Sequence, residues 1–216
     1  MSEEELNQLV YSKNVIEFVT VANEFCLFVD NNANYNRFDF IDKAHKIFPL
    51  LYLKACLLPD IEDDNTETPE KFLNEVDYNF LLNKLSSKLG QYDSYQEVFD
   101  EGMQFSESAI SVNISENICD IYQDLKDFLM AFRIGSTEIM TDAIWECKNN
   151  FNNFWGQKLV NGLRALHAIR YNNMDIEEDG GTDQLKQPGD ESEKESWVKK
   201  HFNNYFDGED PTTDDL

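Results

Sequence analysis

The feature of this sequence that most limits its fold is a helical spacing of apolar residues that continues from residue 12 to residue 171. Apolar side chains recur at intervals of three and four, as in Val15, Ile16, Val19 and Ala22, which places them on one face of an α-helix. No segment shows the alternation of apolar and polar residues that is typical of a strand, and no hairpin turn interrupts the pattern. The spacing therefore predicts an all-α fold.

Capping residues and prolines divide this pattern into separate helices. We expect helices over residues 12–30, 36–58, 74–90, 94–103, 115–135 and 137–169, with a surface loop over residues 59–72. Asn74 and Ser115 are expected to cap two of these helices at their N-termini, and Gly90 is a typical helix stop. Pro49 predicts a kink or break near Phe48. Short connections favour a mostly antiparallel bundle of about six to seven helices, with the second and last packed centrally.

The composition changes after Tyr171. Residues 172–216 carry 14 acidic and 4 basic side chains, which is too polar a composition to offset the entropy of ordering the chain. We therefore expect a helical domain at residues 1–171 and a flexible, acidic, largely disordered C-terminal tail at 172–216. Within the tail, residues 196–207 predict a short amphipathic helix that docks on a partner or on the body of this chain, through Trp197, Phe202, Tyr205 and Phe206.

The net charge of −24 limits the classes of partner. A field of this sign repels phosphate backbones and anionic headgroups, so we expect no direct contact with nucleic acid or with a membrane. A basic protein partner fits this charge. The N-terminus shows no basic segment followed by an apolar one, and no apolar run approaches the ~20 residues that span a bilayer, so we expect a cytoplasmic location.

Cysteine and acidic residues give no metal or cofactor signal. The four cysteines, Cys26, Cys56, Cys119 and Cys147, each lie in an apolar helical pattern and are predicted to be buried free thiols. The acidic run at 60–64 lacks the glycine and the closing glutamate of a calcium loop. Asp42 and His45 share a helix face, as in one half of a di-metal bundle site, but the sequence offers no second such pair. We expect no metal and no cofactor.

Polar residues on otherwise apolar helix faces are the candidate site residues. The segment 50–58 is apolar around nearly its whole circumference, so we expect it to be buried, with its single charge, Lys54, mostly buried and paired with a carboxylate. On the last helix, Arg170 and His167 point toward the apolar side, and Arg164 precedes them. Either these groups are satisfied inside the bundle, or Lys54, Arg164, His167 and Arg170 line a pocket for a small ligand or anion.

Three carboxylates, Asp120, Asp124 and Asp127, also share one helix face. At ~100° per residue they point away from the apolar residues of the same helix. We interpret them as a solvated face.

Four separated segments resemble a known family. These are VIEFVTVA at residues 15–22, PLLYLKA at 49–55, ENICDIYQDLKDF at 116–128 and WGQKLVN at 155–161, the last continuing to Leu166 and His167. They resemble domain-of-unknown-function family 5063 of Bacteroidetes over roughly residues 12 to 171. The resemblance implies a bacterial cytoplasmic protein and carries no activity, cofactor or catalytic residue with it.

Two hypotheses for the function follow. The chain shows no glycine-rich phosphate loop, nucleophile elbow or Cys/His pair at catalytic spacing, which excludes the easily recognised enzyme classes. The first hypothesis is a non-catalytic protein-interaction protein, an adaptor or regulator, that presents an acidic surface and an aromatic tail motif. The alternative is a small-ligand-binding protein or an enzyme of unrecognised class that uses a polar pocket in the bundle.

Overall fold

Helices form over most of the segments that the apolar spacing predicts, in a computed structural model that describes residues 3–61, 72–97, 110–172 and 176. All of these residues belong to one compact unit, Met1–Asp179. Its α-helices are α1 (Glu3–Val10), α2 (Lys13–Asp30), α3 (Arg37–Cys56), α4 (Glu75–Leu89), α5 (Ile114–Phe132), α6 (Thr137–Asn150) and α7 (Gly156–Tyr171). The predicted tail, including the amphipathic segment at 196–207, lies outside the described residues.

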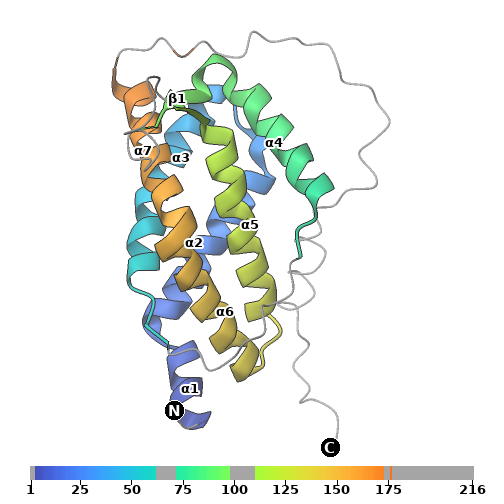
Figure 1. Cartoon of the computed structure of the whole chain (residues 1–216), viewed down its shortest axis with the longest axis vertical. Coiled ribbons are helices and arrows are strands. Elements are labelled where there is room, and N and C mark those ends of the chain that lie inside the picture. The colour runs from blue at the N-terminus through green and yellow to red at the C-terminus, as the bar shows by residue number, and fades with distance from the viewer. Residues whose placement is uncertain (1–2, 62–71, 98–109, 173–175, 177–216) are drawn as a thin grey trace, which may run out of the picture. The chain divides into compact units, whose positions relative to one another are not determined.

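The helices pack as an antiparallel bundle, as predicted (Figure 1). Phe25 of α2 contacts Phe48 of α3, and Phe28 contacts Phe40, so the two helices run in opposite directions. In the same way Phe18 near the start of α2 contacts Phe128 near the end of α5. Burial of these rings against one another forms the core between α2, α3 and α5.

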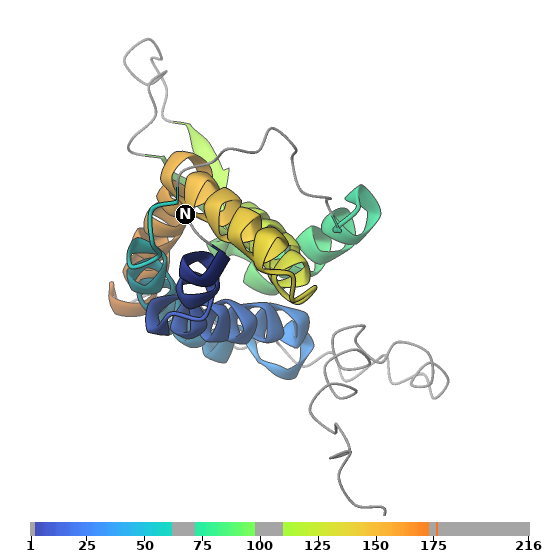
Figure 2. The ribbon, with the colours of Figure 1, turned by 90° about the horizontal axis from the view of Figure 1, so that it is seen from below.

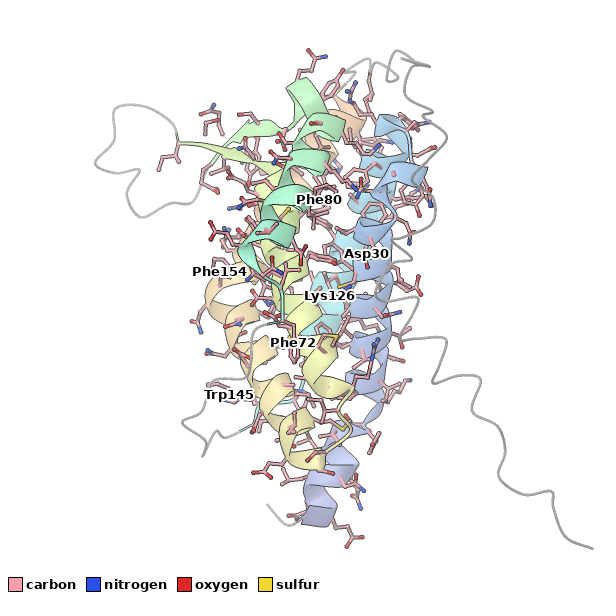
Figure 3. The ribbon with its side chains drawn as sticks, turned by 90° about the vertical axis from the view of Figure 1, so that its right-hand side faces the viewer. Asp30, Phe72, Phe80, Lys126, Trp145 and Phe154 are labelled. Atoms are coloured by element: carbon pink, nitrogen blue, oxygen red, sulfur yellow. The ribbon has the colours of Figure 1, made fainter. Side chains whose placement is uncertain are left out.

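Helix α5 is the central element of the other side of the bundle. It packs against α2, α4, α6 and α7, and α4 lies at the edge of the unit, as Figure 2 shows. Asp30 of α2 and Lys126 of α5, labelled in Figure 3, form an ion pair with the carboxylate oxygen and the ammonium nitrogen 3.2 Å apart. The hydroxyl of Tyr122 also donates to Asp30 at 2.6 Å.

The acidic face of α5 is not the solvated face that the sequence predicts. Asp127 is buried and accepts the backbone N–H of Phe72 at 2.8 Å. Asp124 accepts from Asn150 of α6, and Asp120 accepts from the Tyr78 hydroxyl of α4 at 2.7 Å. Local periodicity could not show this, because the donors come from α4, α6 and the segment before α4. These carboxylates therefore tie the neighbouring helices to α5.

The helix predicted over residues 94–103 is wrong for its first residues, and residues 98–103 lie outside the described residues. Residues Ser94–Gln96 form a strand, β1, which pairs antiparallel with β2 (Ser111–Asn113), and Tyr95 lies opposite Val112. Three residues are too short a stretch for alternation to be recognised, and the pairing depends on a partner strand far along the chain. The described residues therefore form a mostly helical fold with one two-stranded sheet.

Some of the predicted helix ends are confirmed. The Asn74 side chain accepts the N–H of Asp77 at 3.0 Å, and Gly90 ends α4 with φ at 56°. Ser115, however, does not cap α5, because it lies inside the helix. The buried carboxylate of Asp93 takes that role and accepts the Ser115 N–H and hydroxyl, each at 2.7 Å.

Helix α3 continues through Pro49 without a break, contrary to one of the predicted outcomes. Phe48 and Leu51 on either side of the proline are both fully buried. Packing on both sides of Pro49 therefore holds the helix together despite the hydrogen bond that proline cannot donate.

The last predicted helix contains a π-helical segment. Helix α6 continues into η4 (Phe151–Trp155) and then into α7, so residues 137–171 form one continuous rod. The segment ends at Gly156, where an added Cβ would lie 2.3 Å from the Phe151 carbonyl oxygen. Gly156 is therefore the residue that permits this turn.

Three of the four cysteines are buried as predicted, and Cys56 is exposed. Burial raises the pKa of the Cys26 thiol to about 12 and that of Cys119 to about 12. Burial also raises the pKa of Cys147. The prediction for Cys56 is wrong because the end of α3 is less covered than its sequence suggests.

Candidate functional site

The C-terminal half of α3 and the residue that follows it expose three leucines, which we call the leucine stripe: Leu50, Leu53 and Leu57. Their exposed fractions are 45%, 53% and 43%. The spacing of three and four residues places them on one helix face. The prediction that the whole segment is buried is wrong, because the core takes up only the opposite face, where Leu51 and Ala55 are fully buried.

On one flank of the leucine stripe, Lys54 pairs with Glu17 of α2. The ammonium nitrogen lies 2.6 Å from the Glu17 carboxylate oxygen, and 20% of the Lys54 side chain is exposed. The prediction of a mostly buried lysine paired with a carboxylate is confirmed. The hydrogen bond from Lys54 lowers the pKa of Glu17, against the opposing effect of its partial burial.

About two helical turns before the leucine stripe, Arg170 of α7 meets Asp42 of α3. The guanidinium Nε donates to Asp42 at 3.1 Å, and the group lies 4.8 Å from the ring centroid of Phe38. Lys46 also pairs with Asp42, at 2.6 Å. The hydrogen bond from Lys46 lowers the pKa of Asp42, burial opposes it, and Arg170 lowers it further.

Next to this pair, two imidazoles and a phenol form a small aromatic cluster. His45 Nε2 and His167 Nδ1 lie 3.3 Å apart, and both rings contact Tyr171. His167 is exposed, so the prediction that it is anchored inside the bundle is wrong. Arg170 is half-buried and held at the surface between α3 and α7.

The four residues predicted to line a pocket do not share one contact set. Lys54 binds Glu17, Arg170 binds Asp42 and His167 contacts His45, while Arg164 is exposed. The feature they share is their position on α3 or α7, which pack against each other.

Helices α3 and α7 are the basic elements of an acidic chain. Helix α3 has four basic and two acidic residues, and α7 has three basic and no acidic residues. Every other α-helix among the described residues carries at least as many acidic as basic residues. The exposed members include Lys43, Lys46 and Arg164. The leucine stripe therefore lies on one of the two described α-helices in which basic residues outnumber acidic ones.

A polar cluster under the β-strands was missed by sequence reasoning. The buried Asn117 donates to the Tyr95 hydroxyl at 2.6 Å, and the buried Asn161 donates to Glu97 at 2.7 Å. Gln157 donates to Asn161 at 2.8 Å. The first two bonds join β1 and the residue after it to α5 and α7, and no sequence signal could have found them because their partners lie on different elements. Their hydrogen bonds give this cluster a structural role.

Within residues 3–61, 72–97, 110–172 and 176, no group of three or more His, Cys, Asp or Glu side chains is placed to hold a metal ion. A helix with the length and apolarity needed to cross a bilayer is likewise not found in this described part of the chain.

The histidine pair makes the stability of the domain depend on pH. Burial lowers the pKa of His45, and the neighbouring His167 lowers it further, while Asp42 raises it and Arg170 and Lys46 lower it. A histidine with a lowered pKa in the folded state costs stability as the pH falls below about 6.5, because the unfolded chain then binds more protons. We expect a lower melting temperature at pH 5.5 than at pH 7.5, and a smaller difference in His45→Asn. An equal difference in the variant would contradict this.

This chain is similar to a known protein family and to a solved structure. A family model described as "Domain of unknown function (DUF5063)" matches residues 9–172. Among solved structures, the chain is similar to the crystal structure of protein BF1032 from Bacteroides fragilis, with 43% identity and a TM-score of 0.68. That similarity covers 78% of this chain and 99% of that chain. No curated protein matches this chain.

Proposed function

This chain belongs to the DUF5063 family, and from that premise we propose that it is a non-catalytic protein-interaction protein, an adaptor or regulator. The observation that carries the proposal is the leucine stripe. Single exposed leucines are ordinary on a protein surface, but three on one face over two helical turns are the pattern by which one helix recognises another.

The excess of basic residues on α3 and α7 indicates the chemistry of the partner. Lys43, Lys46 and Arg164 lie exposed on the two basic helices. We propose that the stripe takes an amphipathic segment with acidic residues beside its apolar face, because opposite charges steer association and disfavour other partners. The basic protein partner that the net charge predicts would bind the acidic helices instead, and it is a separate proposal.

The geometry gives less support to the small-ligand alternative. A ligand pocket needs polar groups that converge with free bonding capacity. Lys54 and Arg170 instead each hold a carboxylate of the same chain. His167 already contacts His45.

Affinity capture with matched variants tests the proposal. Leu53→Gln removes the most exposed leucine of the stripe, and Val76→Gln makes the same kind of change at an exposed position of α4, where 77% of the valine is exposed. Burial of a leucine contributes about 1.5–3 kcal/mol, so we expect Leu53→Gln to lower capture of a specific protein about tenfold or more. Quantitative mass spectrometry of the captured proteins measures this.

The control variant separates an effect of the leucine stripe from a general effect of replacing an exposed apolar side chain. Neither substitution removes a buried contact, so both variants should unfold within about 0.5 kcal/mol of the wild type. We expect Val76→Gln to capture the same proteins as the wild type. Equal capture by all three chains would overturn the role of the stripe.

A further inference from the structure

We propose that His45 of α3 and His167 of α7 together chelate one exchangeable ion of the zinc class, a binding site that goes beyond the interaction role proposed above. Imidazole nitrogens suit Zn²⁺, Cu²⁺ and Ni²⁺, whereas Mg²⁺ and Ca²⁺ take oxygen ligands. Asp42 and His45 share one face of α3, and the second imidazole comes from α7, 122 residues further along the chain.

The spacing of the two ring nitrogens fits a shared ion. His45 Nε2 and His167 Nδ1 lie 3.3 Å apart. Nitrogens bind Zn²⁺ at about 2.0–2.1 Å, so two of them at a tetrahedral angle are about 3.3–3.4 Å apart. The same distance is long for a direct hydrogen bond between the rings. An ion that replaces this weak hydrogen bond therefore finds both nitrogens at the separation that it needs.

Both rings have the freedom to direct a lone pair at the ion. A neutral imidazole carries its proton on one ring nitrogen and a lone pair on the other. In a shared tetrahedral complex each lone pair points about 35° away from the line that joins the two nitrogens. His167 is exposed and His45 is half-buried, so this change needs only rotation of side chains at the surface. Helices α3 and α7 pack against each other and hold the two backbones in place.

The charges around the pair are compatible with a cation. The positive groups that act on His45 are Arg170 and Lys46, and each of them pairs with the Asp42 carboxylate, at 3.1 and 2.6 Å. This pairing weakens their repulsion of an ion at the rings. At longer range, the net charge of −24 attracts cations to the chain.

The bound ion keeps open positions. Two protein nitrogens fill two of the four positions of tetrahedral Zn²⁺, and the neighbouring Tyr171 is 58% exposed, so water reaches the others. With about half the binding free energy of a four-ligand zinc site, we expect a Kd on the order of 10 µM. Such an ion exchanges with solution, and while bound it links α3 to α7.

Isothermal titration calorimetry on the full-length chain tests the proposal. We expect a single equivalent of Zn²⁺ to bind with a Kd on the order of 10 µM, and His45→Asn and His167→Asn each to weaken binding about tenfold or more. Two matched controls should leave the affinity unchanged: His201→Asn, which removes the third histidine, and Cys56→Ser, which removes the exposed thiol.

Mg²⁺ controls for general attraction of divalent cations to an acidic chain. Mg²⁺ at the same concentration should not bind with comparable affinity, because it prefers oxygen ligands. Unchanged Zn²⁺ affinity in either His45→Asn or His167→Asn, or equal binding of Mg²⁺, would overturn the proposal.

Proton NMR on the wild-type chain provides a test that does not depend on the folding of any variant. The chain has three histidines, so its imidazole protons give three sets of signals. Zn²⁺ should shift or broaden the signals of His45 and His167 together and leave those of His201 in place. Any other pattern, such as equal movement of all three sets, would mean that the pair does not chelate the ion.

Discussion

Replacing Gly156 by alanine is expected to destabilise the domain by about 3 kcal/mol. The new Cβ would lie 2.3 Å from the Phe151 carbonyl oxygen and 3.0 Å from two atoms of the Phe151 ring. Alanine gains about 1 kcal/mol of helix propensity over glycine, which is less than the cost of forcing a backbone oxygen out of a packed helix. Chemical denaturation at constant slope measures the difference.

Gly162→Ala is the matched control for this substitution. Its Cβ would lie 3.0 Å from one ring atom of Phe48, and its next neighbour is 3.6 Å away. A side chain yields more readily than a backbone carbonyl, so we expect a loss of about 1 kcal/mol or less. A Gly156→Ala variant as stable as the wild type would mean that the π-helical segment is not fixed by the close approach of these two residues.

Asp93→Ala is expected to cost roughly 2–4 kcal/mol of unfolding free energy. The carboxylate supplies the cap of α5 and binds both the N–H and the hydroxyl of Ser115, which is itself buried. Alanine would leave two buried donors without an acceptor at a helix N-terminus, where a negative charge is also favoured. Thermal and denaturant unfolding provide the measurement.

Two further variants separate the parts of this effect. Asp93→Asn keeps an oxygen that can accept the Ser115 N–H, so its loss should be smaller than that of Asp93→Ala. Ser115→Ala removes one of the two hydrogen bonds, and combining it with Asp93→Ala should cost less than the sum of the single changes. A loss below about 0.5 kcal/mol for Asp93→Ala would show that the cap is supplied elsewhere.

Local patterns in the sequence were sufficient to predict most helices and some of their ends. Asn74 and Gly90 act through residues within one turn, so their roles can be seen in the sequence alone. Asp93 acts on Ser115 across a strand pair, and no local rule connects them. The same limit explains the buried carboxylate of Asp127, whose donors precede α4.

The sequence contains a feature that indicates the π-helical segment, namely a spacing of apolar residues that does not fit a regular α-helix. Cys147, Phe151, Trp155, Leu159 and Leu163 are spaced by four residues throughout. On a regular α-helix each such step turns about 40° too far, so the five side chains would leave one face. In a π-helix the backbone hydrogen bonds join residues five apart, so each residue turns the chain through a smaller angle and the drift is corrected. Phe151, Trp155 and Leu159 are accordingly all buried.

The exposure of the leucine stripe could not be predicted from α3 itself. An apolar circumference predicts burial only when neighbours cover every side, and α3 packs against α2 on one flank and α7 on the other. Which flank remains open depends on the number and path of the other helices. The candidate residues predicted from the sequence lie on α3 and α7, and the leucines of α3 that were expected to be buried are exposed.

The four thiols differ in accessibility, so a single cysteine of this chain can be labelled selectively. A thiol must be accessible and ionised to react with a maleimide. Cys26, Cys119 and Cys147 are neither, because they are buried and burial raises the pKa of each thiol. Cys56 is exposed at the last turn of α3, directly before Leu57. An environment-sensitive fluorophore on the unaltered protein will therefore attach at the end of the stripe, next to Leu57. A change in its emission will report the binding of another protein to the leucine stripe.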